Sequence, residues 1–234
     1  MAERTAGSIR ARVRAEMVEE IKNAARRQLA ETGSDLSLRA VAREMGMVSS
    51  AVYRYFASRD DLLTALILDA YNSLGEASEV AGAAVADRSD FLGRWLAVAH
   101  AVRDWAVAQP HEYALIYGSP VPGYAAPQDT VEPSIRPVVV LGEILNDAHN
   151  AGALAGRAPV PPPTSLSAEV RRVRDVVAPD VGEEAMVRAL IAWTELFGAV
   201  SFELFGRFHN TITDLATWFD HQARIMATFL GLSD

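Results

Sequence analysis

The apolar residues of this chain repeat with helical spacing along almost its whole length, and no segment alternates apolar and polar residues as a strand does. This pattern predicts an all-α fold. We expect helices, in chain order, over 14–31, 38–45, 48–56, 59–74, 89–109, 110–117, 133–150, 167–177, 182–206 and 213–230. Gly33 and Gly46 follow the first and second of these segments, where a glycine typically ends a helix. Ser37 and Ser58 precede the second and fourth helices and are expected to cap them.

Composition favours a soluble, cytoplasmic protein that needs no metal or cofactor. Half of the 234 residues are hydrophobic, which is enough for a core and excludes disorder as the main state. The absence of cysteine excludes disulfides, cysteine-based zinc sites and a thiol nucleophile. No apolar run approaches the roughly 18 residues that would span a bilayer, and the charged segment MAERTAGSIRARVR lacks the apolar stretch of a secretory signal.

The charge of the chain is divided unevenly between its two parts. Residues 1–60 carry 11 basic and 8 acidic side chains, whereas residues 61–234 carry 11 and 22, so the net charge of −8 comes from the second part. A basic head on an acidic body would orient the head toward a polyanion. Ordinary surface variation would give the same difference, so charge alone does not decide the partner.

Residues 37–56, SLRAVAREMGMVSSAVYRYF, have the organisation of a helix-turn-helix. Two short helices flank Gly46, and the second helix can enter the major groove if its exposed face is small enough to approach the bases. That face and its flanks offer hydroxyl, aromatic and cationic groups for phosphates or bases. The residues expected to contact DNA are Ser37, Arg39, Ser49, Ser50, Tyr53, Arg54, Tyr55 and Arg59.

The stretch from about Ile21 to Leu68 resembles the DNA-binding domain of the TetR family of bacterial transcriptional regulators. Four pieces carry the resemblance in the family's order and spacing: AARRQLAETG, LSLRAVAREMGM, AVYRYF and SRDDLLTAL. Further along, WTELFGAVSFELFGR looks like the core of a C-terminal domain named for a Trp-His-Gly signature. Trp193 and Gly198 match that signature, but Phe197 stands where the histidine would be.

The resemblance implies a homodimer that binds a palindromic DNA operator and is released, as a repressor, by a small-molecule inducer. By position, Ser37 and Arg39 would contact phosphate or a base, and Tyr53 and Arg59 would contact phosphate. Two positions at the start of the reading helix depart from the family, because Val48 and Ala51 replace common hydroxyl residues. Ser49 and Ser50 are therefore the better candidates there.

We expect three segments: a flexible N-terminal arm over 1–13, the helix-turn-helix domain over 14–60, and a ligand-binding and dimerisation domain over 61–234. The arginines of the N-terminal segment could follow the minor groove, or the segment could simply be disordered. These arginines are Arg4, Arg10, Arg12 and Arg14.

The body contains aromatic side chains that could line a ligand cavity, although each could equally be a core residue. Pockets for small ligands are mostly apolar with a few polar groups, for which Glu195, His100 or His149 are candidates, so the expected inducer is largely apolar. The aromatic candidates are Trp95, Trp105, Tyr113, Tyr117, Tyr124, Trp193 and Phe197.

The helices predicted over 182–206 and 213–230 are apolar around much of their circumference. Such helices are either central in a monomer or shared with another chain. Two from each copy would form a four-helix interface, which is the expected homodimer contact.

No catalytic signature is present. None of the five histidines has a glutamate three residues before it, as a di-iron bundle would require, and G-x-S-x-G, P-loop and G-x-G-x-x-G motifs are absent. We therefore expect no enzyme. The alternative to a DNA-binding regulator is a helical adaptor that binds proteins, or a small-molecule-binding protein without specific DNA recognition.

Overall fold

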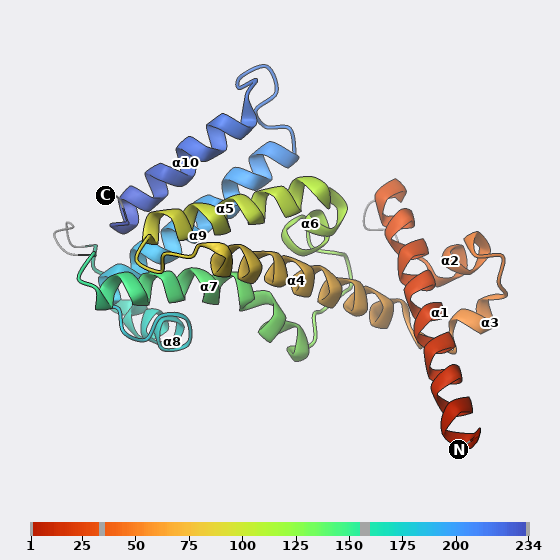
Figure 1. Cartoon of the computed structure of the whole chain (residues 1–234). Helices are drawn as coiled ribbons and strands as arrows, with labels where there is room; N and C mark the ends of the chain where they lie inside the picture. Colours follow the sequence, from red (N-terminus) through yellow and green to blue (C-terminus); the bar gives the residue numbers. More distant parts are fainter. Residues whose placement is uncertain (1, 33–35, 155–159, 233–234) are drawn as a thin grey trace. The chain divides into compact units, whose positions relative to one another are not determined.

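A computed structural model describes residues 2–32, 36–154 and 160–232, and the regular elements in these ranges are all helices (Figure 1). The prediction of an all-α fold is therefore confirmed. The elements are α1 (Ala2–Thr32), α2 (Leu38–Glu44), α3 (Ser49–Val52), α4 (Arg59–Ala84), α5 (Phe91–Ala108), α6 (Pro110–Tyr117), η1 (Gln128–Thr130), α7 (Val131–Asn150), η2 (Thr164–Leu166), α8 (Ser167–Val177), α9 (Glu183–Leu204) and α10 (Leu215–Leu230).

The chain forms two compact units, and α4 begins in one and ends in the other. The first unit comprises Met1–Ala70 and His111–Thr130, and the second comprises Tyr71–Pro110 and Val131–Asp234. This division differs from the boundary at residue 60 that the sequence predicted. The difference arises because α6 and the proline-rich segment after it pack with the helix-turn-helix part of the chain.

Ion pairs join three helices of the first unit. Arg26 on α1 lies 2.7 Å from Asp69 on α4 and 2.8 Å from Glu112 on α6. Lys22, one turn earlier, also reaches Asp69 at 2.7 Å. Burial lowers the pKa of Lys22, but its hydrogen bonds with Asp69 and Glu19 outweigh that effect and leave the pKa above its usual value of 10.5. The lysine is therefore a fixed positive charge that holds α1 against α4.

Several helix ends differ from the sequence prediction. Helix α1 begins at Ala2 rather than near Arg14, so residues 2–13, expected as a flexible arm, are helical. Their alanines, arginines and one glutamate are compatible with a helix. Gly33, the predicted end of this helix, lies outside the described residues. Helix α4 continues through the Gly/Ala-rich segment to Ala84. At Gly75, the Arg136 side chain occupies the space where a Cβ would lie, so glycine allows this close approach.

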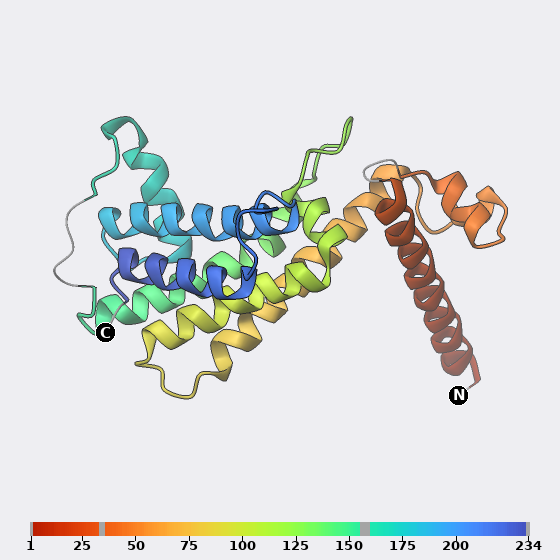
Figure 2. The same ribbon diagram turned by 90° about the horizontal axis from the view of Figure 1, so that it is seen from above.

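The second unit is built around α9, which packs with α5, α8 and α10 (Figures 1 and 2). The Trp95 indole on α5 donates a hydrogen bond of 2.9 Å to the Ala223 carbonyl on α10. Arg103 on α5 makes two hydrogen bonds, of 2.6 and 2.8 Å, with the carboxylate of Glu203 on α9. The first contact joins α5 to α10, and the second joins α5 to α9.

Among the described residues, α9 is the one helix long and apolar enough to cross a membrane by length and composition. Core helices of globular proteins meet the same criterion. One side of α9 carries buried core residues such as Met186, Leu196 and Val200. Its other side also carries apolar residues, and these are exposed.

Candidate nucleic-acid interface and ligand cavity

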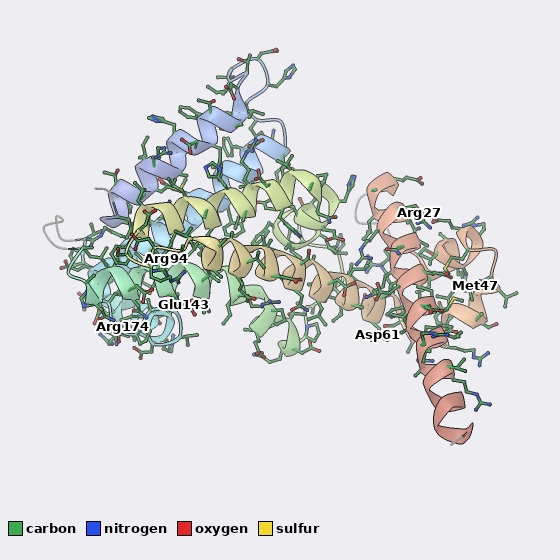
Figure 3. All side chains as sticks on the ribbon, in the orientation of Figure 1. Arg27, Met47, Asp61, Arg94, Glu143 and Arg174 are labelled. Carbon is green, nitrogen blue, oxygen red and sulfur yellow. The ribbon has the colours of Figure 1, made fainter. Side chains whose placement is uncertain are left out.

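Helices α2 and α3 form the helix-turn-helix that the sequence predicted. Gly46 lies between them with φ +66°, a left-handed conformation that glycine adopts without steric cost. Leu38 and Val41 on α2, and Val52 and Phe56 at α3, are buried. Because these apolar side chains hold both helices on the first unit, the polar side of α3 is left facing solvent. Figure 3 labels Met47 in the segment that joins the two helices.

The exposed side of α3 presents the expected DNA-contacting groups. Ser50, Tyr53 and Arg54 are exposed, with Tyr53 at 45%, while Ser49 and Tyr55 are half-buried. The helix itself covers only Ser49–Val52, shorter than the predicted 48–56, and continues as hydrogen-bonded turns. Tyr53 and Arg54 are presented from these turns.

The arginines of the helix-turn-helix differ in whether they are engaged by the protein. Arg39, Arg43 and Arg54 are exposed, and their guanidinium groups have no hydrogen-bond or ion-pair partner among the described residues. Arg27, by contrast, extends from α1 to Glu44 at 2.6 Å (Figure 3). Arg59 donates to the Leu36 carbonyl at 3.1 Å. The uncompensated positive charge therefore lies around α2 and α3, where phosphates would be bound.

Ser58 caps α4 as predicted, whereas the expected side-chain cap by Ser37 is absent. The Ser58 hydroxyl accepts a hydrogen bond of 3.1 Å from the backbone N–H of Asp61. Ser37 occupies the N-cap position of α2, but its hydroxyl makes no capping bond, and its backbone N–H donates to Gln28 at 3.2 Å. The half-exposed Ser37 hydroxyl is thus not used to cap the helix.

Arg14 has a structural role that the sequence did not suggest. Its guanidinium lies over the Tyr55 ring, 5.1 Å from the centroid, and approaches the Arg54 carbonyl at 3.4 Å. A cation over an aromatic face is attracted by the ring quadrupole. Arg14 therefore supports the end of the reading segment from α1. Arg12, another candidate for a minor-groove arm, lies 3.6 Å from Glu16 on its own helix.

Comparison with known proteins identifies this arrangement. The profile described as "Bacterial regulatory proteins, tetR family" matches residues 21–66, and "Tetracyclin repressor-like, C-terminal domain" matches residues 95–226. The HTH-type transcriptional regulator Rv1816 of Mycobacterium tuberculosis is 41% identical over 214 residues, which cover 88% of each chain. The chain belongs to the TetR family of transcriptional regulators. It is therefore related to DNA-binding regulators and not to enzymes.

The chain is also similar to other proteins and solved structures. The regulator Mb1846 of Mycobacterium bovis is likewise 41% identical over 88% of each chain. The crystal structure of a protein designated SCO4313 superposes with a TM-score of 0.74 at 35% identity, over 93% of this chain and 98% of that one. The TetR regulator PfmR of Thermus thermophilus shares the fold, with a TM-score of 0.58 at 16% identity, over 88% of this chain and 96% of that one.

The predicted ligand residues do not all line one cavity. Tyr113, Tyr117 and Tyr124 belong to the first unit, and the Tyr124 hydroxyl is 2.9 Å from the Thr64 hydroxyl. In the second unit, the Trp105 indole donates to Ser73 at 2.9 Å. The remaining three, Trp95, Trp193 and Phe197, lie in the second unit, with the Trp193 and Phe197 ring centroids 6.1 Å apart.

Trp95 and Trp193 do line a small apolar cavity between α5, α7, α8, α9 and α10, together with Leu141, Val177 and Leu230. Its volume is about 20 Å³, enough for one water molecule. The Trp193 Nε1 atom is buried and has no hydrogen-bond partner among the described residues. A buried donor without an acceptor costs about 1–3 kcal/mol. One residue of the apolar cavity lining thus carries an unsatisfied donor.

The polar residues suggested for the ligand lie elsewhere. His100 binds Asp220 at 2.9 Å, and His149 is exposed near the end of α7. Glu195 is exposed and lines a separate surface groove. Sequence periodicity could place these residues on helices, but it could not say which helix faces meet.

A larger groove of about 650 Å³ was missed by the sequence analysis. It lies between α4, α5 and α7, and its lining includes Arg94 and Glu143, both labelled in Figure 3. Across it, Arg136 on α7 lies 2.7 Å from Glu79 on α4 and donates to the Asn72 carbonyl at 3.1 Å. These contacts tie α7 to the part of α4 that lies in the second unit.

Arg39→Ala and Arg59→Ala should separate DNA contact from fold stability. Arg39→Ala removes an exposed, unpaired charge, so it should leave the melting temperature unchanged and weaken DNA binding about fivefold or more, with the salt slope reduced by about 0.9 per lost phosphate contact. Arg59→Ala also loses the bond to Leu36, which should lower the free energy of unfolding by about 1 kcal/mol. Thermal denaturation measures the stability of each variant, and fluorescence anisotropy over a salt series measures its DNA affinity and salt slope. An unchanged salt slope for Arg39→Ala would exclude a phosphate contact.

Trp193→Phe and Trp95→Phe remove the same atoms from two walls of one cavity. Trp95→Phe breaks the hydrogen bond to Ala223, whereas Trp193→Phe removes a donor that has no acceptor. The Trp95 variant should therefore be less stable than the Trp193 variant by about 2 kcal/mol in urea denaturation. Equal losses of stability in the two variants would mean that Trp193 Nε1 has a hydrogen-bond acceptor in solution.

Proposed function

We propose that this TetR-family regulator binds a palindromic DNA operator as a homodimer, represses from that site, and is released by a small, largely apolar ligand. The observation that carries the DNA-binding part is the solvent-facing side of α3. It combines Ser50, Tyr53 and Arg54 with the unpaired arginines Arg39 and Arg43. Such a protein would act in the cytoplasm, where DNA is accessible.

Each exposed group has a distinct role in this proposal. Arg39, Arg43 and the Tyr53 hydroxyl bind phosphates and set the position of the head, since phosphate contacts carry no sequence information of their own. Ser49 and Ser50, at the start of α3, approach base edges. Val48, which is 71% exposed at the same end, is suited to contact a thymine methyl group.

The homodimer is supported by apolar side chains left exposed on the last two helices. Phe202 on α9 is 54% exposed and Ile225 on α10 is 53% exposed. Pairing these surfaces across a two-fold axis would give the four-helix contact expected from the sequence. Two heads related by this axis would then read half-sites about 34–36 Å apart.

The ligand site we propose is the apolar cavity next to Trp95 and Trp193. The unsatisfied Trp193 N–H favours a ligand with one acceptor oxygen and an otherwise apolar body. At about 20 Å³, the cavity must expand to admit such a molecule. Expansion would displace α7 and α9, and Arg136 links α7 to α4. Because α4 continues into the DNA-binding unit, it is the element expected to transmit the change.

Selection of bound duplexes from a random DNA pool tests the regulator directly. We expect enrichment of a palindrome whose half-sites are about one helical turn apart. Salt-sensitive retention without an enriched motif would contradict specific operator binding. No retention of DNA by a folded dimer would favour the protein-binding adaptor instead.

The ligand proposal is tested on the selected operator. Apolar compounds that carry one carbonyl or hydroxyl oxygen should raise the melting temperature and lower operator affinity, and Trp193→Phe should reduce both effects by about fivefold or more, as expected for a lost hydrogen bond. A compound that binds equally well to the free and DNA-bound protein would leave the operator affinity unchanged. If only highly polar compounds stabilise the protein, the apolar ligand class is wrong.

A further inference from the structure

The groove of about 650 Å³ between α4, α5 and α7 has charged residues at both ends and an apolar middle, and we call it the charged groove. Its volume falls within the range of roughly 300–1,000 Å³ that small-ligand sites span. Arg88, Arg94 and Glu143 line one of its ends, and Figure 3 labels the last two. All of its lining residues belong to the second unit, so the groove lies within one compact part of the chain.

Arg94 brings a buried guanidinium with an unused donor to this end. Its side chain is only 1% exposed. The Nη1 atom lies 2.7 Å from the Asp147 carboxylate and donates to the Arg88 carbonyl at 2.9 Å. The Nε atom has no hydrogen-bond partner among the described residues. A buried cationic N–H without an acceptor is unfavourable, so an oxygen atom placed here would stabilise the site.

Arg88 adds a positive charge that no carboxylate neutralises in the part of the chain that the structure describes. Its Nη1 donates to the Gly82 carbonyl at 2.8 Å, and it forms no ion pair there. Asp87 and Asp90, its acidic neighbours in sequence, accept hydrogen bonds from residues of their own segment. Guanidinium groups bind carboxylates through short, charge-assisted hydrogen bonds. Arg88 and Arg94 together therefore favour a ligand carboxylate.

Glu143 is a carboxylate without a partner beside these two arginines. It is exposed, and it makes no hydrogen bond or ion pair among the described residues. It precedes Asp147 by four residues on α7, which places the two Cβ atoms about 6 Å apart on one helix face. Because Asp147 itself contacts Arg94, Glu143 lies close to the arginines. It can bind an ammonium group next to a carboxylate that the arginines hold.

An apolar floor begins at the same end of the charged groove. Gly82, whose carbonyl accepts from Arg88, lies against Val140, since a Cβ on Gly82 would be 3.0 Å from Val140 Cγ1. Val139 and Ile135 continue the lining along α7. The floor can therefore hold an apolar group that is attached near the two charged groups of a ligand.

The far end of the charged groove neutralises most of its own charge. Arg136 donates hydrogen bonds of 2.7 and 2.8 Å to the Glu79 carboxylate. These hydrogen bonds hold the pKa of Glu79 below its usual value of 4.5, so the pair stays ionised. Glu132 is exposed one turn before Arg136, about 16 Å along α7 from Glu143. A small ligand that uses both signs of charge therefore fits the first end and not the far one.

We propose that the end of the charged groove at Arg88, Arg94 and Glu143 binds a free L-α-amino acid with an apolar side chain. The ligand carboxylate accepts hydrogen bonds from Arg94 Nε and from the Arg88 guanidinium. Its ammonium donates to Glu143, and its side chain lies on Gly82 and Val140. Because Arg94 is almost fully buried, a small movement of the groove wall admits the carboxylate.

The mixed charge of the site favours an amino acid over a simpler ligand. A carboxylic acid without an ammonium group would bring its negative charge next to Glu143. An amine without a carboxylate would lie next to the guanidinium groups of Arg88 and Arg94. A molecule that carries both charges on one carbon satisfies all three side chains at once.

The site is separate from the cavity proposed for the apolar ligand. Leu141 and Leu145 line that cavity, whereas Val139 and Glu143 line the charged groove. These residues lie on opposite faces of α7, because successive residues of a helix are turned by about 100°. The inference thus goes beyond the proposed function and does not depend on it.

Isothermal titration calorimetry on the full chain tests the ligand class. L-phenylalanine and L-leucine should bind. Phenylpropanoate lacks the ammonium group and phenylethylamine lacks the carboxylate, so each should bind about tenfold more weakly or worse, as expected for a lost charged hydrogen bond. The proposal is overturned if neither amino acid binds at about 10 mM, or if phenylpropanoate or phenylethylamine binds as tightly as L-phenylalanine.

Arg88→Gln and Glu143→Gln each remove one charge from an exposed side chain and should weaken L-phenylalanine binding about tenfold or more. Glu143→Gln should also reduce the preference for L-phenylalanine over phenylpropanoate, which a general loss of structure would not do. The matched controls are Arg172→Gln on α8, outside the groove, and Glu132→Gln at the far end, and both should bind like the wild type. Thermal denaturation checks the fold of each variant. Unchanged binding by Arg88→Gln or by Glu143→Gln would overturn the site.

The outcomes separate this site from the proposed function. Trp193→Phe should leave L-phenylalanine binding unchanged, because Trp193 lines the other cavity. Binding that is lost in Trp193→Phe and kept in Arg88→Gln would place the amino acid in the apolar cavity and overturn the present assignment. A failure to enrich a palindrome would remove the proposed regulator, whereas the calorimetric result on the groove would stand.

Discussion

The structure depends on the apolar character of α9 around most of its circumference. A helix of this kind tends to bury more than one face, and the described residues of the chain cover only part of it. Helices α5, α8 and α10 cover the side that carries Met186, Leu196 and Val200. The other side carries exposed apolar side chains, among them Ile191 and Phe202. The homodimer proposed above would bury them.

The same helix also connects the two apolar hollows of the second unit. Leu190 lines both the internal cavity next to Trp193 and the surface groove next to Ile191. Any expansion of the cavity therefore acts on a side chain that also forms the groove. Packed interiors have little free volume, so such a displacement is passed on to the neighbouring residues.

The DNA-binding unit follows a different principle, in which a small apolar anchor leaves the charged groups exposed. Val52 and Phe56 hold α3 in place, and Arg14 supports Tyr55 from α1. Arg27 forms an ion pair with Glu44, and Arg59 donates a hydrogen bond to the Leu36 carbonyl, so these two arginines stabilise the unit. Arg39, Arg43 and Arg54 have no partner among the described residues and remain available to an anion.

The sequence by itself determined the helical fold, the order of the helices, the helix-turn-helix and the family, because each depends on local periodicity, glycine position and a contiguous motif. Ser58 was recognised as a helix cap for the same reason, since a cap acts within one turn. Only the tertiary structure decided which side chains meet. It separated Tyr113, Tyr117 and Tyr124 from the cavity of Trp95 and Trp193, engaged Arg59 but not Arg39, and placed Arg14 over Tyr55. These outcomes depend on how helices distant in the sequence pack, and a one-dimensional pattern shows which face of a helix is apolar but not which helix will cover it.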